Sequence, residues 1–201
     1  MELQEIIRER RSYRKYNDKK VSGEDLKEIV EAGLWAPSAT NIQPWYFVAI
    51  ANEEVMEELR AIAGKGSIAF KEKLMQRFPD HPEVVRDTTS FIGTLGGAPC
   101  AVLAFARAES LNGDSPAIQS IGAAIENMIL TAYGKGIKSC WLTSLSRGET
   151  ADKIHERFAP ERGELEAVVV FGYSDQEAKA PKRKDDRAEF ILQDNALNLK
   201  L

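Results

Sequence analysis

Histidine, cysteine and long apolar runs are scarce in this chain of 201 residues, and each scarcity excludes a class of protein. The two histidines, His81 and His155, lie far apart, and no HExxH motif or Cys/His ligand spacing occurs, so we predict no metal site. The two cysteines, Cys100 and Cys140, are too few for a disulfide framework, and we expect free, buried thiols. The absence of GxSxG and P-loop motifs argues against a serine hydrolase of that kind and a P-loop nucleotidase.

No apolar run reaches the roughly 20 residues that a membrane-spanning helix needs. The segment Met1–Arg14 mixes Glu with Arg and lacks the apolar stretch of a secretory signal. We therefore expect a cytoplasmic protein with no membrane partner.

Charge is nearly balanced, with 27 Lys and Arg against 31 Asp and Glu and a net charge of −4. This balance argues against binding nucleic acid over the whole surface. Two basic clusters stand out, one within Arg8–Lys20 and one within Lys179–Lys184. Such runs are most often solvated faces; the alternatives are a phosphate site assembled from both clusters, or a surface for a polyanionic partner.

Apolar patterns predict helices that alternate with buried strands. The predicted helices are Glu2–Arg11, one that starts at Ser22 and ends before Pro37, Glu53–Ala63, Phe70–Phe78, Ile118–Tyr133 and Thr150–Phe158. The predicted strands are Trp45–Ile50, Cys100–Ala106 and Ala167–Gly172, each expected to be buried on both faces, and the weaker Ile137–Thr143. This alternation predicts an α+β or α/β sandwich with helices on both sheet faces. The apolar tail from Phe190 is expected to dock on its own subunit or across a dimer.

One match to a dinucleotide-binding fingerprint occurs, because Gly64–Ala69 fits G-x-G-x-x-A. That fingerprint must follow a strand and open a helix, whereas this match follows the helical pattern Glu53–Ala63. We therefore interpret it as a flexible connection between two helices.

Two segments carry residues suited to binding a ligand. Arg10–Arg14 (RRSYR) places three guanidinium groups and a hydroxyl within five residues, which suits contacts with one phosphate. Ala36–Trp45 (APSATNIQPW) is polar, is stiffened by two prolines and leads directly into a strand. Such a loop suits a planar polar ligand, although a capped turn explains the same residues equally well.

Together these segments resemble the nitroreductase family of FMN-dependent oxidoreductases, and the resemblance covers nearly the whole chain. It is carried by RRSYRKY (Arg10–Tyr16), APSATNIQPW (Ala36–Trp45), GAPCAVLAFA (Gly97–Ala106), SIGAAIENMILTAYGKGIKSCWL (Ser120–Leu142) and VVVFGYSDQEAKAPKRK (Val168–Lys184). The segment Phe70–Phe91 matches no family pattern; insertions of this kind in the family often cover the substrate site.

The resemblance implies which residues contact FMN. Those for the phosphate and ribityl chain are Arg10, Arg11, Ser12 and Arg14, with Lys182 and Lys184 as second phosphate-binding cations. Those on the loop that reaches the partner subunit's flavin are Pro37, Ser38, Asn41 and Gln43, and those lining the ring are Leu142, Thr143 and Ser144. The family commonly has Lys-x-Arg where this chain has Lys182-Arg183-Lys184, so either Arg183 or Lys184 faces the phosphate.

The resemblance also implies a fold and a reaction. The fold is an α+β sandwich with a mainly antiparallel central sheet flanked by helices, one FMN-binding domain over residues 1–201, assembled as an intertwined homodimer. The reaction passes hydride from NADH or NADPH through FMN to a nitroaromatic, quinone or similar small-molecule acceptor in a ping-pong cycle, with no catalytic side chain singled out. Reductive dehalogenation or flavin breakdown on the same scaffold, and FMN binding without catalysis, are the alternatives.

Overall fold

A four-stranded antiparallel sheet lies at the centre of the computed structural model, which describes residues 1–107, 117–185, 187–188, 190–192 and 195–197. Its strands are β1 (Trp45–Ile50), β2 (Cys100–Ala106), β3 (Lys138–Leu142) and β4 (Leu165–Gly172). They lie side by side in the order β1-β2-β4-β3, so β1 and β3 are the two edges.

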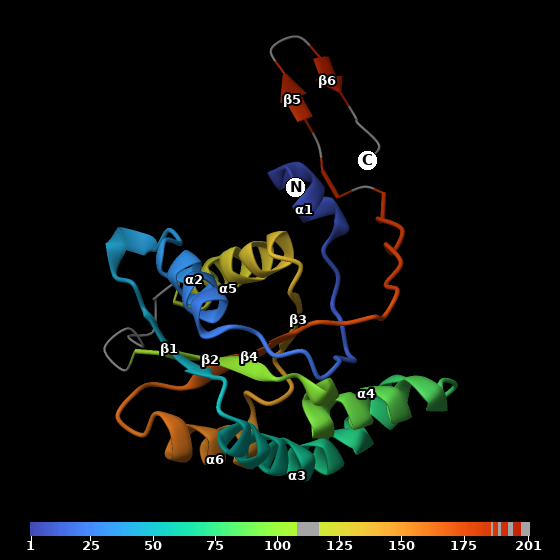
Figure 1. The fold of residues 1–201 in the computed structure, drawn as a ribbon. Coiled ribbons are helices and arrows are strands. Elements are labelled where there is room, and N and C mark those ends of the chain that lie inside the picture. The colour runs from blue at the N-terminus through green and yellow to red at the C-terminus, as the bar shows by residue number, and fades with distance from the viewer. Residues whose placement is uncertain (108–116, 186, 189, 193–194, 198–201) are drawn as a thin grey trace.

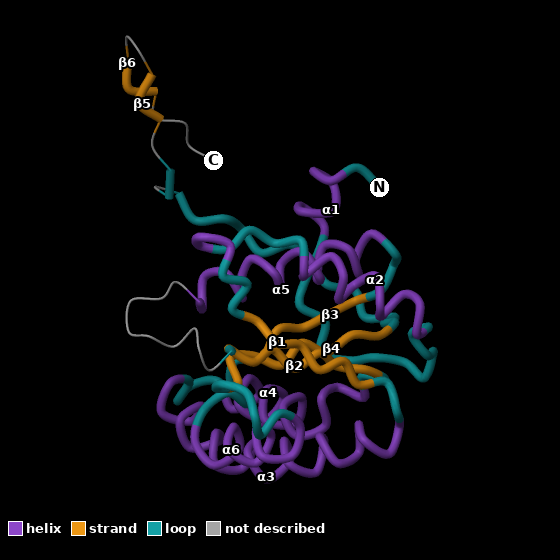
Figure 2. Tube along the Cα trace, turned by 90° about the vertical axis from the view of Figure 1, so that its left-hand side faces the viewer, coloured by secondary structure: helices purple, strands orange, loops and turns teal. Residues whose placement is uncertain are grey.

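Helices cover both faces of this sheet, as Figures 1 and 2 show. The helices are α1 (Leu3–Glu9), α2 (Gly23–Leu34), α3 (Glu53–Arg77), α4 (Pro82–Thr94), α5 (Ala117–Gly134) and α6 (Gly148–Phe158), with short 3-10 turns η1 (Ala39–Asn41) and η2 (Leu95–Gly97). Helices α2 and α5 cover one face, and α3, α4 and α6 cover the other. The predicted α+β sandwich with an antiparallel sheet is confirmed.

The central strands β2 and β4 are apolar along their whole length because both of their faces are covered. Successive side chains of a strand point to opposite faces. Val102 and Val169 therefore pack with α2 and α5, whereas Leu103 and Val168 pack in the cluster that contains α3, α4 and α6. Strand β1 differs from the prediction, because it is an edge strand whose residues Tyr46 and Ala49 are exposed.

Helix boundaries follow the predicted signals in part. The Ser22 hydroxyl accepts a hydrogen bond from the backbone N–H of Asp25 at 3.0 Å, so Ser22 caps α2 as expected. Helix α5 is largely buried, but Ile118, the first residue of the helix predicted from its apolar pattern, is 66% exposed. No described helix combines the length and the apolarity needed to cross a bilayer.

The flexible connection predicted at Gly64–Ala69 is wrong, because α3 runs without a break from Glu53 to Arg77. The glycine pattern has a packing cause: a Cβ at Gly66 would overlap the side chain of Thr150 on α6. A glycine at this position lets the two helices approach closely. Unassigned Phe70–Phe91 forms the end of α3, a turn and most of α4.

After β4 the chain forms an arm that ends in a small hairpin of β5 (Phe190–Leu192) and β6 (Asn195–Leu197). In both views the hairpin stands away from the two helical layers. The described part of the tail therefore does not dock on its own subunit, and docking across a dimer stays a prediction. Leu199 lies outside the described residues.

Candidate functional site

The segment Arg10–Tyr16 is fixed along the β3 edge of the sheet. Ser12 forms an isolated parallel bridge with Ser139 of β3, and the backbone N–H of Tyr13 donates to the Ser139 carbonyl at 2.9 Å. The rings of Tyr13 and Tyr16 are buried in the core, which anchors the segment from below. The side chains of Arg10, Arg11 and Ser12 are thus carried by backbone that the sheet holds in place.

A pocket of about 330 Å³ lies where this segment meets α5 and β3. Its lining residues are Arg10, Arg11, Ser12, Glu126, Ile129, Ser139, Trp141 and Thr143. We call it the arginine pocket. It brings together three predicted phosphate contacts and Thr143, one of the predicted ring contacts, which follows β3.

The donors of the arginine pocket fit an oxyanion. Arg10 contacts Oε1 of Glu126 through Nε at 3.1 Å and Nη2 at 3.0 Å. Arg11 donates through Nη1 to the carbonyls of Arg8 and Arg10, while its Nε is buried and has no partner among the described residues. Because two guanidinium groups and one carboxylate line this pocket, a positive charge and an unused buried donor remain for a ligand.

The other predicted phosphate contacts lie outside the arginine pocket. The guanidinium of Arg14 lies 5.9 Å from the centre of the Phe91 ring, with Nη1 3.4 Å from the Ser12 carbonyl oxygen. Lys182 and Lys184 are exposed on the arm that follows β4. This arm starts against the N-terminal segment, since Gln176 Oε1 accepts from the Arg14 backbone N–H at 3.2 Å. The two basic clusters therefore belong to neighbouring stretches of chain.

A second pocket, of about 470 Å³, lies between α3 and the start of α6. Its lining residues are Ile62, Lys65, Gly66, Ala69, Phe70, Lys73, Thr143, Ser144, Arg147, Gly148, Glu149, Thr150 and Lys153. We call it the lysine pocket. Thr143 lines both pockets, so they adjoin, and Ser144 lines only this one. Leu142, the remaining predicted ring contact, is buried in the core at 4% exposure.

The polar loop before β1 lines neither the arginine pocket nor the lysine pocket of its own chain. The loop leads into β1, and β1 and β3 are the two opposite edges of the sheet (Figure 1). The arginine pocket lies at β3. Within it, the Ser38 hydroxyl accepts from the Gln43 backbone N–H at 3.0 Å, and Gln43 Nε2 donates to Asn41 Oδ1 at 3.1 Å. Pro37, Ser38, Asn41 and Gln43 contact neither pocket of their own chain.

Sequence reasoning missed Glu126, the counter-ion of Arg10, and the cations Lys65 and Lys73. A signal for Glu126 existed, because it is the one charged residue between Ala117 and Gly134. No comparable signal marks the two lysines on the long helix α3, where Lys65 lies between two glycines and Lys73 follows Lys71 and Glu72. The largest cavity among those described, of about 570 Å³ between α3 and α4, contains none of the predicted site residues.

Both cysteines are free and buried, as predicted. Cys140 lies in β3, next to the arginine pocket, and Cys100 lies in β2. Burial raises the pKa of the Cys100 thiol to about 12 and also raises the pKa of Cys140. Neither thiol is therefore poised as a nucleophile.

Comparison with known proteins points to one family. A family model described as the nitroreductase family matches residues 7–173. An Archaeoglobus fulgidus protein that carries the provisional name NADH dehydrogenase/NAD(P)H nitroreductase is 31% identical over 188 residues, which cover 92% of each chain. A crystal structure of a BluB-like flavoprotein from Clostridium difficile 630 is 30% identical with a TM-score of 0.76, covering 96% of this chain and 100% of the other. A crystal structure of a Bacteroides fragilis nitroreductase with bound FMN is 26% identical with a TM-score of 0.73, covering 96% of this chain and 100% of the other.

Proposed function

The chain belongs to the nitroreductase family, and we propose that it is an FMN-dependent oxidoreductase that uses NADH or NADPH to reduce a nitroaromatic, quinone or similar small acceptor. The observation that carries this proposal is the arginine pocket, where Arg11 Nε is buried beside Arg10 and Ser12 with no partner among the described residues. A phosphomonoester, with nearly two negative charges, matches this donor set. Residues 1–201 are proposed to form one such domain.

The proposed roles of the residues follow from their positions. Arg10, Arg11 and Ser12 bind the phosphate, and the arm with Lys182, Arg183 and Lys184 adds cations from the side of Arg14. Thr143 and Ser144, where the two pockets adjoin, lie against the ring, and buried Leu142 supports them. When bound, FMN supplies the electron transfer between the nicotinamide donor and the acceptor.

A homodimer is proposed because one chain keeps the two halves of the predicted site apart. In a dimer, Pro37, Ser38, Asn41 and Gln43 of one subunit would approach the flavin held by the other subunit's arginine pocket. The surface around this loop supports an interface. Trp35 is 87% exposed and Leu34 is 49% exposed immediately before it, and exposed apolar groups of this size favour burial against a partner.

The test of the function is a bleaching experiment on purified protein. We expect a yellow protein whose colour is bleached by NADH or NADPH and restored when an acceptor reoxidises the flavin. Colourless protein that takes up no added FMN would contradict the proposal, and yellow protein that no nicotinamide reduces would leave a non-catalytic FMN binder.

A different reaction on the same scaffold is the second candidate, favoured by the similarity to a flavoprotein of another name. The same assay separates these reactions. Halide release from a halogenated aromatic indicates reductive dehalogenation. Flavin absorbance that does not return when air is readmitted indicates flavin breakdown.

A further inference from the structure

The lysine pocket is strongly basic in a protein whose net charge is −4. Four basic side chains line it, namely Lys65, Lys73, Arg147 and Lys153, against the single carboxylate of Glu149. Three positive charges are therefore left over in one pocket. A local excess of charge of one sign in a concave site raises the local concentration of ligands that carry the opposite charge.

The contacts inside the pocket leave this excess in place. Lys153 contacts Glu149 at 2.5 Å and, with a smaller effect from Lys65, lowers the pKa of Glu149, which stays ionised. Glu166, which does not line the pocket, lies near Arg147; burial raises the pKa of Glu166, and the charge of Arg147 opposes this with a smaller effect. Lys73 has no carboxylate within salt-bridge distance among the residues that the structure describes. Glu149 is thus the carboxylate that interacts with both Lys153 and Lys65, and Lys73 remains available to a ligand.

The backbone at the pocket also favours an anion. Helix α6 starts here at Gly148, and the side chain of its N-cap residue Arg147 makes no capping hydrogen bond. The N–H groups of a first helical turn lack partners within the helix and carry a partial positive charge. Gly66 lets α3 approach Thr150 closely, which sets Lys65 and Lys73 on the opposite wall from α6.

We propose that the lysine pocket binds the phosphate or carboxylate group of an anionic substrate, whose reacting part lies near Thr143, where this pocket adjoins the arginine pocket. This inference rests on the proposed function, because it assigns the neighbouring pocket to FMN. Two sources of the anion share this chemistry: the pyrophosphate of the nicotinamide donor, and an acidic group on the acceptor.

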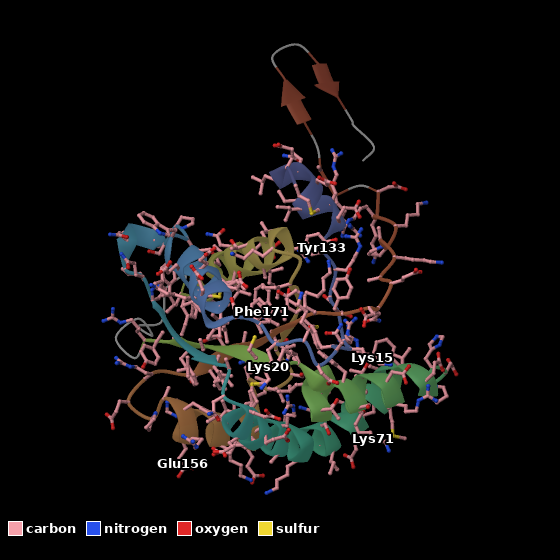
Figure 3. The ribbon with its side chains drawn as sticks, in the orientation of Figure 1. Lys15, Lys20, Lys71, Tyr133, Glu156 and Phe171 are labelled. Carbon is pink, nitrogen blue, oxygen red and sulfur yellow. The ribbon has the colours of Figure 1, made fainter. Side chains whose placement is uncertain are left out.

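The experiment compares Lys65→Ala/Lys73→Ala with Lys71→Ala, which removes a lysine from the same helix outside the lysine pocket (labelled in Figure 3). FMN affinity is measured by titrating each apoprotein. Calorimetry on each FMN-loaded protein then measures the binding of NAD⁺, of 4-nitrobenzoate and of uncharged nitrobenzene. NAD⁺ stands in for the donor without reducing the flavin.

In the double variant we expect about tenfold weaker binding of at least one anionic probe, since two exposed cations each contribute modestly. FMN and nitrobenzene binding should match the Lys71→Ala control. Weakening confined to NAD⁺ identifies the donor as the source of the anion, weakening confined to 4-nitrobenzoate identifies the acceptor, and weakening of both indicates that they use the pocket in turn.

Two results would overturn the inference while the proposed function stands. In the first, the FMN-loaded double variant binds NAD⁺ and 4-nitrobenzoate as tightly as the Lys71→Ala control does. In the second, the double variant loses only FMN affinity, which would assign these lysines to the cofactor. Wild-type protein that takes up no FMN would instead defeat the proposed function and this inference together.

Discussion

The arginine segment and the polar loop are built in opposite ways, although the family resemblance assigns both to one flavin. The segment Arg10–Tyr16 is bonded to the backbone of β3 and anchored by buried tyrosines. Of the four non-glycine residues with positive φ in the described part of the chain, the loop holds three, namely Thr40, Asn41 and Gln43. Its side-chain hydrogen bonds to described residues stay within the loop.

This difference indicates which half of the site one chain completes. A non-glycine residue in a sparsely populated backbone region costs about 1–3 kcal/mol, and such residues cluster at functional sites. The arginine segment lines a pocket of its own chain, whereas the loop is strained, mostly exposed and lines neither pocket of its own chain. We infer that the loop is preformed for a surface outside this chain.

The largest expected effect comes from mixing two inactive proteins. One carries Arg10→Ala/Arg14→Ala, and the other carries Ser38→Ala/Asn41→Ala. If sites are shared, one site of each heterodimer contains only wild-type contacts, so an equal, fully exchanged mixture regains about a quarter of the intact sites. FMN binding and NAD(P)H oxidation of the mixture measure this. No recovery despite proven exchange, or a fully active monomer in sedimentation, would break the comparison.

Next in size is the loss of FMN affinity in Arg10→Ala. Removing a charged donor to phosphate should cost about 1.5–3 kcal/mol, or roughly ten- to a hundredfold in affinity. Arg8→Ala is the matched control, because Arg8 carries the same charge two residues earlier and does not line the arginine pocket. Titration of apoprotein with FMN measures both. Equal affinities for the two variants would remove Arg10 from the site.

A gain is expected from Glu126→Gln. The Glu126 carboxylate neutralises Arg10 and repels a phosphate in the same pocket, whereas glutamine keeps an acceptor for Arg10 without the charge. Because both side chains are about one-third exposed and partly screened, we expect only about three- to tenfold tighter FMN binding. Glu156→Gln on α6 (Figure 3) removes the same charge outside both pockets and should leave FMN affinity unchanged. Weaker binding in Glu126→Gln would show that the ion pair positions Arg10 instead.

Glycine substitutions should sharpen the comparison through stability. Thr40 is β-branched at φ 47°, so Thr40→Gly relieves strain and should stabilise the apoprotein by about 1 kcal/mol, or about 2–4 °C in Tm. Ser12→Gly, in the bonded segment, relieves no positive φ and should destabilise by about 0.5–1 kcal/mol. Thermal unfolding of the two variants measures both signs, and a destabilised Thr40→Gly would mean that the loop is not strained.

Sequence reasoning succeeded where a local pattern decides the structure. Runs such as Cys100–Ala106 are apolar because two helical layers cover both faces, and that demand is visible residue by residue. The Ser22 cap is likewise a matter of four consecutive residues. Arg10, Arg11 and Ser12 of the arginine-rich segment share one pocket with Thr143, and their predicted contacts with FMN stay a prediction.

It failed where a distant element decides. Gly66 is explained by Thr150 on another helix, and the exposure of β1 follows from its place at the sheet edge. The lysine pocket likewise depends on α3 lying beside the start of α6. None of these neighbours can be found from spacing along the chain.

The smallest expected effect concerns the thiol beside the arginine segment. If β3 holds that segment rigidly, Cys140 stays covered, and burial keeps both thiols protonated. With a pKa of about 12, Cys100 is a thiolate in about one molecule in ten thousand at pH 8, whereas an unfolded cysteine, with a pKa near 8.5, is about one-quarter ionised. Iodoacetamide at pH 8 should therefore label neither thiol in native protein, as mass spectrometry would show, and both in guanidinium.

Cys100→Ala and Cys140→Ala should keep nicotinamide-dependent flavin reduction within about twofold, since a buried thiol acts as a small apolar side chain. Rapid labelling of native Cys140 would mean that the β3 edge opens, and the contrast between a fixed segment and a strained loop would fail at its fixed end.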